Sequence, residues 1–266
     1  MPFVELSDIV THYRIDGSAP TTVALVNSLG ADLRIWDEVI PAFRGRQESL
    51  RFLRYDLRGH GLTESTPPPY RLQTLAEDLA RVMDACETRR AVLCGVSIGG
   101  LIALQLAAAN PERVSGLILC DMVAKIGDAT YWEERMATVQ SGGIETIADG
   151  ALERWFTSAF RSGRPADVRG WRNMLVRTSI DGYLGACAAL RDGDLRHAAR
   201  SLQVPTLVLC GSEDGVMNPE TVQEFAESVP GARFELLAGA GHLPCIEQPA
   251  AMALSMENFL EEQRLV

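Results

Sequence analysis

The sequence predicts an α/β fold in which helices cover both faces of a mostly parallel sheet. Short apolar runs bounded by turn residues recur along the chain, and stretches with helical periodicity lie between them. Strands that alternate with helices favour a parallel sheet with right-handed crossovers. The 266 residues, of which 47% are hydrophobic and 23% charged, contain enough apolar material for a sizeable core.

Eight strands are expected, taken in chain order. The first two form an antiparallel hairpin within residues 3–15, at the edge of the sheet. Helical stretches such as Leu72–Cys86 and Gly100–Ala109 separate later strands. The other six strands are predicted from apolar runs at residues 21–30, 50–56, 90–95, 114–121, 206–211 and 233–237.

The alternation of strands and helices stops between residues 122 and 202, where several amphipathic helical stretches occur without a core strand. Pro205 precedes the next apolar run, TLVLC, which marks the return to the sheet. We therefore predict a core formed by residues 1–121 and 203–266, and a helical cap, or lid, formed by residues 122–202.

Composition excludes several classes of function. The net charge of −10, without a concentrated basic face, argues against nucleic acid as a partner. No stretch approaches the roughly 18 apolar residues of a membrane span, and the start lacks the features of a signal peptide, so we expect a cytoplasmic protein with no membrane partner. The six cysteines are scattered without a CxxC pair, which favours buried thiols over disulfides or a metal site. A small anionic substrate remains compatible with this composition if an arginine near the site offsets the negative electrostatic field of the protein.

The segment Gly95-Val96-Ser97-Ile98-Gly99 follows the apolar run AVLC and precedes the apolar helix GLIALQLAAA. This strand-turn-helix context is the one that the nucleophile elbow of the α/β-hydrolase fold requires. The glycines permit a sharp turn that strains the serine backbone and presents the hydroxyl at the carboxyl end of the sheet. A helix N-terminus at that point favours developing negative charge. The sequence therefore predicts the α/β-hydrolase fold with Ser97 as nucleophile.

A serine hydroxyl needs a base, and the base needs a group that orients it. Of the four histidines, His242 lies in a glycine-rich loop after the last predicted strand, where this fold places its base. His12 lies in the edge hairpin and His197 in the cap. His60 lies on the same rim as His242, but it is interpreted as a structural residue of a turn. His242 is the predicted base.

Two aspartates compete for the role of the acid that orients this histidine. Asp214 follows the run 206–211, and Asp121 ends the preceding predicted strand. The chain order of serine, acid and histidine admits both residues. Asp214 occupies the commoner position and is preferred, while the other interpretation of Asp121 is a loop or cap residue at the mouth of the site.

The oxyanion hole is expected to consist of backbone N–H groups. One belongs to Ile98, which follows the nucleophile, and the second belongs to Leu29 in the loop after the first long strand. That loop reads Asn27-Ser28-Leu29-Gly30, whereas many α/β-hydrolases carry His-Gly and a large residue there. Ser28 could alternatively contribute its hydroxyl group.

Seven segments, spread over most of the chain, resemble one family. They are NSLGADLRIWD (27–37), RYDLRGHGLTES (54–65), CGVSIGGLIALQLAA (94–108), AKIG (124–127), ERWFTSAF (153–160), GYLGACAALRDGDLR (182–196) and AGAGHLPCIEQP (238–249). The family is that of the 3-oxoadipate enol-lactonases of bacterial aromatic degradation, which are α/β-hydrolases with a helical cap. The resemblance implies that Ser97 opens the enol-lactone ring to an acyl-enzyme, and that water activated by His242 releases 3-oxoadipate. It implies no metal and no organic cofactor.

The lactone substrate that the resemblance implies carries a carboxylate. A buried carboxylate requires a charged or multiply hydrogen-bonded partner. The candidate substrate-binding residues are Ser28, Arg34, Trp132, Arg135, Arg154 and Trp155. The alternative for each is a solvated arginine on a helix face or a tryptophan that anchors the core.

Other functions on this fold remain open. A general carboxylesterase or a cofactor-free haloperoxidase-type hydrolase would use the same Ser, Asp and His set. A non-catalytic ligand-binding protein is an alternative of another class, because fold does not fix function, although the complete set speaks against it. A haloalkane dehalogenase is disfavoured because its elbow carries aspartate, where this chain has Ser97. The sequence leaves the oligomeric state open, a homo-oligomer included.

Overall fold

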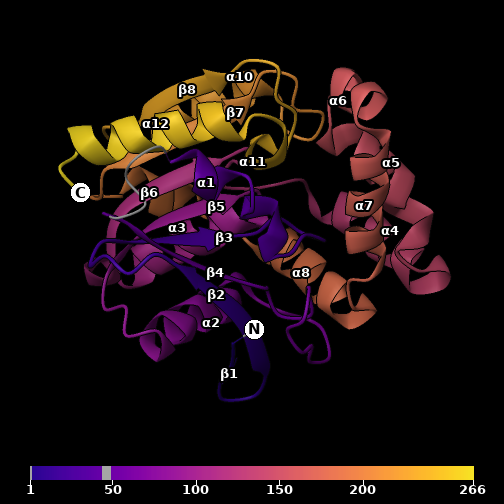
Figure 1. Ribbon diagram of the computed structural model, residues 1–266. Coiled ribbons are helices and arrows are strands. Elements are labelled where there is room, and N and C mark those ends of the chain that lie inside the picture. The colour runs from indigo at the N-terminus through magenta and orange to yellow at the C-terminus, as the bar shows by residue number, and fades with distance from the viewer. Residues whose placement is uncertain (1, 44–48) are drawn as a thin grey trace.

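An eight-stranded sheet runs through the structure, a computed structural model that describes residues 2–43 and 49–266. The order of the strands across the sheet is β1-β2-β4-β3-β5-β6-β7-β8 (Figure 1). Their bounds are β1 Phe3–Glu5, β2 Val10–Asp16, β3 Thr22–Val26, β4 Arg51–Tyr55, β5 Ala91–Val96, β6 Val114–Cys120, β7 Thr206–Gly211 and β8 Arg233–Leu237.

The sheet is parallel from β4 to β8, and antiparallel pairing is confined to the N-terminal edge. There β1 pairs with β2, and β2 pairs with β4, both antiparallel. The remaining neighbours are parallel: β3 pairs with β4 and β5, β5 with β6, β6 with β7, and β7 with β8. The predicted mostly parallel sheet and the predicted edge hairpin are confirmed.

Central strands of the sheet are buried on both faces. Every residue of β3, β5 and β7 is buried, which explains their uninterrupted apolar sequence. Helix α2 packs against α3, and α1 packs against α12. Right-handed crossovers place α2 and α3 on one face, and α1 on the other, since the chain moves in opposite directions along the sheet in these connections. The helices and turns of the core are η1 Leu33–Trp36, α1 Val39–Ala42, α2 Leu72–Ala85, α3 Ile98–Ala109, η2 Pro111–Arg113, α9 Arg196–Arg200, α10 Pro219–Ser228, α11 Pro244–Glu247 and α12 Pro249–Glu262.

Between β6 and β7 the described chain forms helices only. Figure 1 shows α4, α5, α6 and α7 beside the sheet, with α8 between them and the core. Helix α4 packs against α5 and α8, and α7 packs against α5 and α6. The bounds of these five helices are α4 Ala129–Gly142, α5 Glu145–Trp155, α6 Ser158–Gly163, α7 Pro165–Val176 and α8 Ile180–Asp192. The short helix α9 follows them before β7 and packs against α3 of the core.

Helix α8 connects this helical segment to the core. A Cβ atom at Gly182 would collide with the backbone of Gly59, in the loop after β4, so the two chains approach too closely for a side chain. The N–H of Ser179 donates to the carbonyl of Gly59 at 3.1 Å, and the N–H of Tyr70 donates to the carbonyl of Gly185 at 3.3 Å. These contacts fix α8 over the carboxyl edge of the sheet.

All six cysteine thiols are buried and form no disulfide bond; they belong to Cys86, Cys94, Cys120, Cys187, Cys210 and Cys245. Among the residues described, none of the helices has both the length and the apolar character needed to cross a membrane.

Candidate active site

Ser97 lies in the turn between β5 and α3, and its backbone is strained. Its φ of 57° and ψ of −120° are rare for a residue with a side chain. Close packing explains both neighbouring glycines: a Cβ at Gly95 would strike the backbone of Gly99, and a Cβ at Gly99 would strike the carbonyl of Val26 in β3. The turn therefore holds the Ser97 hydroxyl at the carboxyl edge of the sheet, where the side chain is 7% exposed.

His242 lies in the loop between β8 and α11, with 1% of its surface exposed. Its Nδ1 atom is 2.9 Å from Oδ2 of Asp214. Its backbone N–H donates to the carbonyl of Trp155, at the end of α5, at 2.9 Å. The imidazole is therefore oriented from one side by a carboxylate, and its loop is attached to the helical segment.

Asp214 follows β7 and is held by three donors. Its Oδ1 accepts hydrogen bonds from the backbone N–H groups of Val216 at 2.7 Å and Met217 at 3.1 Å, while Oδ2 contacts His242. Burial raises the pKa of Asp214, but the charge of His242 and these hydrogen bonds outweigh burial and lower it. The carboxylate is therefore ionised at neutral pH, as an acid that orients an imidazole must be.

Asp121, the alternative acid, follows β6 and contacts a different group. Its Oδ1 accepts a hydrogen bond from the backbone N–H of Gly211 at 2.8 Å. Complete burial raises the pKa of Asp121 well above its usual range, and the neighbouring charge of Asp214 raises it further. His242 is thus paired with Asp214, whereas Asp121 accepts from the backbone of Gly211.

A cavity of about 250 Å³ lies above Ser97, between the core and the helical segment. The core contributes Ser28, Leu29, Ser97 and His242 to its wall. The helical segment contributes Tyr131, Trp132, Arg135, Arg154, Trp155 and Tyr183. Eight of the eleven predicted site residues therefore line one cavity; Asp214 contacts it through His242, and Ile98 begins α3 directly after Ser97.

Arg135 and Arg154 bring positive charge into this cavity. Nε of Arg135 donates to the hydroxyl of Tyr183 at 2.9 Å, and Nη1 of Arg154 donates to the hydroxyl of Tyr131 at 3.3 Å. Within the described part of the chain, neither arginine forms a salt bridge with an acidic residue, and Nε of Arg154 is buried without a partner. Their charges are therefore available to an anionic ligand in a protein whose net charge is −10.

The structure does not bring Arg34 to this cavity. Arg34 lies in η1, and its Nε donates to Oδ1 of Asp32 at 2.9 Å. Its guanidinium lines a separate cavity, together with His12 and Asp56. Arg34 is close to the predicted oxyanion loop in sequence, but its side chain is directed toward the carboxylate of Asp32, two residues earlier.

Asn27 fixes the backbone of the loop 27–30, where the sequence predicts one donor of the oxyanion hole. Its Nδ2 donates to the carbonyl of Tyr55 at 2.7 Å, and its Oδ1 accepts from the indole N–H of Trp36 at 2.8 Å. Leu29 thereby reaches the wall of the cavity. Ile98 is the first residue of α3, so its N–H has no acceptor within the helix.

Glu247, which sequence reasoning missed, joins the histidine loop to the helical segment. Its Oε2 accepts from the N–H of Gly241 at 2.6 Å, and its Oε1 accepts from the N–H of Thr157 at 3.1 Å and from its hydroxyl at 2.8 Å. Tyr131 and Tyr183 were also missed, although Tyr183 lies in the segment GYLGACAALRDGDLR. A half-buried glutamate five residues after the histidine carried no sequence signal that distinguished it from a surface carboxylate.

The other histidines lie outside the cavity above Ser97. Nδ1 of His12 is 2.7 Å from Oδ2 of Asp56, and Nδ1 of His60 is 3.1 Å from the carbonyl of Arg58. Burial lowers the pKa of His60, so it is a neutral side chain within a buried turn.

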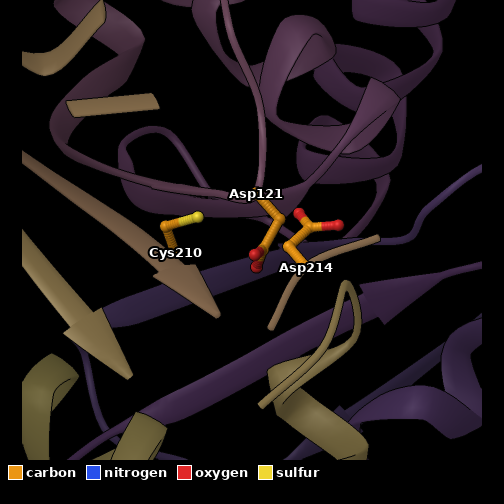
Figure 2. A group of neighbouring side chains, drawn as sticks. All are labelled: Asp121, Cys210 and Asp214. Carbon is orange, nitrogen blue, oxygen red and sulfur yellow. The ribbon is translucent and has the colours of Figure 1, made fainter. Parts of the chain in front are cut away.

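Side chains of Asp121, Cys210 and Asp214 lie together at the ends of β6 and β7 (Figure 2). One ligand atom of each is within 4.8 Å of the others. Burial raises the pKa of both Asp121 and Cys210, while Asp214 already binds His242. Metal ligands must be deprotonated, so the chemistry of this group fits a shared proton better than a metal ion.

Comparison with known proteins agrees with the fold. The model of a family described as the alpha/beta hydrolase family matches residues 23–253. The chain is 33% identical over 255 residues to 3-oxoadipate enol-lactonase 2 of Acinetobacter baylyi, covering 96% of this chain and 94% of that protein. It is similar to the crystal structure of the enol-lactonase from Burkholderia xenovorans LB400, with a TM-score of 0.93, 35% identity, and coverage of 98% of this chain and 100% of that one. It is also similar to a thermophilic esterase from Thermogutta terrifontis, solved with malate bound, with a TM-score of 0.91 and 26% identity over 99% of each chain.

Proposed function

Because the chain belongs to the alpha/beta hydrolase family, we propose that it opens the lactone ring of 3-oxoadipate enol-lactone, with Ser97 as nucleophile. The chain is an ester-hydrolysing enzyme, as its enol-lactonase relatives indicate, and a lactone is an internal ester. The observation that carries the choice of substrate is the cavity above Ser97, where Arg135 and Arg154 have no acidic partner among the described residues. An anionic ester fits this charge.

In the proposed first step, Oγ of Ser97 attacks the carbonyl carbon of the lactone, and Nε2 of His242 removes the hydroxyl proton. The ring C–O bond then breaks, which leaves an ester between Ser97 and the acyl chain. The departing oxygen is an enolate. The imidazolium of His242 gives up the proton that it took from Ser97, directly or through water, and the enolate takes up one proton at carbon, so that His242 is neutral again and the released group is a ketone. An enolate is a better leaving group than an alkoxide, so this step depends less on the acid function of His242.

In the second step, His242 removes a proton from water, and the resulting hydroxide attacks the acyl-enzyme. The bond to Oγ of Ser97 breaks, His242 returns the proton to the serine, and 3-oxoadipate leaves. Asp214 keeps the protonated N–H of the imidazole at Nδ1, so that Nε2 is free to act as base. Its ionised carboxylate also stabilises the imidazolium that forms in both steps.

We assign the oxyanion hole to the backbone N–H groups of Leu29 and Ile98. Ile98 supports the assignment because its N–H lies at the start of α3, next to Ser97 and at the positive end of the helix dipole. Leu29 supports it because the loop that Asn27 fixes brings it to the cavity wall beside Ser97. Donors fixed before the reaction require no rearrangement when the negative charge develops.

Arg135 and Arg154 are proposed to bind the carboxylate of the substrate. With Nε of Arg135 bonded to Tyr183, its two Nη groups remain for a carboxylate. Trp132 and Trp155 provide flat apolar walls of the same cavity. We further propose that residues 122–202 act as the cap of the enzyme, since their helices supply the arginines and both tryptophans.

The test is a comparison of purified enzyme on two substrates. Ring opening of 3-oxoadipate enol-lactone is measured beside hydrolysis of 4-nitrophenyl acetate, a neutral ester of similar size. A charge-assisted hydrogen bond contributes about 1.5–3 kcal/mol, so we expect kcat/KM to favour the lactone by at least ~10-fold. Comparable or greater efficiency on the aryl ester would contradict the proposal and favour a general carboxylesterase.

A further inference from the structure

Asp121 and Asp214 form a close pair of buried carboxyl groups that the proposed mechanism uses only in part. They follow the neighbouring strands β6 and β7, and an oxygen of one lies within 4.8 Å of an oxygen of the other (Figure 2). Asp121 is completely buried, and its φ of 51° is rare outside glycine. A strained, buried aspartate at this point requires a reason.

Backbone hydrogen bonds tie Asp121 to the turn that carries Asp214. The N–H of Gly211 donates to Oδ1 of Asp121 at 2.8 Å, while the carbonyl of Gly211 accepts from the N–H of Asp214 at 3.2 Å. On its other side, Asp121 follows Cys120, whose carbonyl accepts from the N–H of Ser97 at 2.9 Å. Asp121 thus joins the nucleophile turn to the acid turn.

Oδ2 of Asp121 is buried and has no donor among the described residues. The titratable groups that face Asp121 are the carboxylate of Asp214 and the thiols of Cys120, Cys210 and Cys245. The one cationic candidate nearby, His242, is already bonded to Asp214. Two buried carboxyl groups this close, without a cation between them, cannot both ionise.

We propose that Asp121 is a positioning residue, whose Oδ2–H donates a hydrogen bond to the carboxylate of Asp214 and so fixes the orientation of Asp214 toward His242. A carboxylate has about four lone-pair sites, and the contacts of Asp214 with Val216, Met217 and His242 use three of them. The fourth remains for Asp121. The inference rests on the proposed function, because Asp214 acts in it as the partner of His242.

The test compares Asp121→Asn with Asp121→Ala, on 4-nitrophenyl acetate and on the lactone, across the pH range of activity. An asparagine keeps an acceptor for Gly211 and offers a neutral N–H to Asp214. We therefore expect Asp121→Asn to keep kcat within ~3-fold of the unchanged enzyme, with the acid limb of kcat/KM at the same pH. Asp121→Ala should lose about 10-fold in kcat at nearly constant KM. Its acid limb should move to higher pH, because Asp214 without a donor attracts the proton of His242 more strongly.

Two results would overturn the proposal. An acid limb that moves to lower pH in Asp121→Asn would show that the substitution removed a negative charge, so that Asp121 is ionised. A kcat and pH profile of Asp121→Ala equal to those of the unchanged enzyme would show that the hydrogen bond has no effect. Should the alanine variant fail to fold, as judged by circular dichroism, the profile of Asp121→Asn alone decides.

Failure of the proposed function gives a different pattern. If Asp214→Asn keeps its activity while Asp121→Asn loses it, Asp121 is the acid, and the assignment of Asp214 falls together with the inference. If the lactone is not a substrate but the aryl ester is, the positioning role of Asp121 is still measured on the ester.

Discussion

Replacing Arg135 with methionine is predicted to impair the enzyme for its anionic substrate alone. Arg135 is half-buried in the cavity wall, with Nε bonded to Tyr183, and it forms no salt bridge to an acidic residue among the described residues. Methionine keeps the apolar stem of the side chain and removes the charge. The variant therefore isolates the contribution of the guanidinium to binding of a carboxylate.

The magnitude follows from the interaction that is lost. A hydrogen bond to a charged group contributes about 1.5–3 kcal/mol, and a value near 2 kcal/mol corresponds to a loss of ~30-fold in kcat/KM. Partial exposure of Arg135 to water argues for the lower half of this range. Neutral 4-nitrophenyl acetate makes no such contact, so its kcat/KM should change by less than ~3-fold.

The assay measures initial rates on both substrates for Arg135→Met and for Arg169→Met, an exposed arginine of α7 outside the cavity. The control should resemble the unchanged enzyme on both substrates. Equal losses of Arg135→Met on lactone and ester would refute the reasoning, because they would indicate disturbed packing around Tyr183 in place of lost charge recognition. No loss on either substrate would assign the carboxylate to another residue.

Four further outcomes are expected. Ser97→Ala and His242→Ala should each lower kcat by ~10⁴-fold or more, measured with stopped assays at high enzyme concentration, and residual activity near that of the unchanged enzyme would contradict their roles. Asp214→Asn should lower kcat by a smaller factor than either, and a loss equal to that of Ser97→Ala would contradict this ranking. Glu247→Gln should lower the free energy of unfolding by about 1–3 kcal/mol in urea titrations, because its amide NH₂ cannot accept from the N–H of Gly241, and unchanged stability would show that this bond is dispensable. Burial raises the pKa of Asp121 in the folded state. Protonation of Asp121 therefore contributes fully to the free energy of unfolding below the usual aspartate pKa, and this contribution declines as the pH rises toward the pKa of the folded state. Asp121→Asn should therefore gain stability relative to the unchanged enzyme by up to ~1.4 kcal/mol per pH unit between pH 5 and 7, and a difference independent of pH would show that Asp121 is ionised.

Local patterns were sufficient to predict the nucleophile turn. The run AVLC, the glycines around Ser97 and the apolar helix after it are consecutive in sequence, and each has a physical cause that acts over a few residues. The structure shows the expected strand, strained turn and buried helix. The eight strands, and the helices between β6 and β7, follow for the same reason, because hydrophobic periodicity is a local property.

The choice between Asp214 and Asp121 could not be made from local patterns. Both residues follow neighbouring parallel strands, so both lie at the same edge of the sheet. Their contacts in the folded structure distinguish them. Asp214 accepts from the N–H groups of Val216 and Met217 and contacts His242. Asp121 is buried, and its Oδ2 has no donor among the described residues.

The arginines illustrate the same limit. Arg34 follows the oxyanion loop in sequence but bonds to Asp32, whereas Arg135 and Arg154, in separate helices of the segment 122–202, meet in one cavity. Their tyrosine partners, Tyr183 in α8 and Tyr131 in α4, belong to other helices than the arginines they contact, so these contacts could not be inferred from spacing in the sequence.

The identity of the reactive side chain tests the proposed role of Ser97 most directly. Incubation of the enzyme with a fluorophosphonate, followed by mass spectrometry of its peptides, identifies the residue that attacks an ester-like centre. We expect one phosphonyl group per chain, on Ser97, and no labelling of Ser97→Ala or of the denatured protein. Labelling at another residue, or full hydrolytic activity of an enzyme labelled at Ser97, would contradict this role.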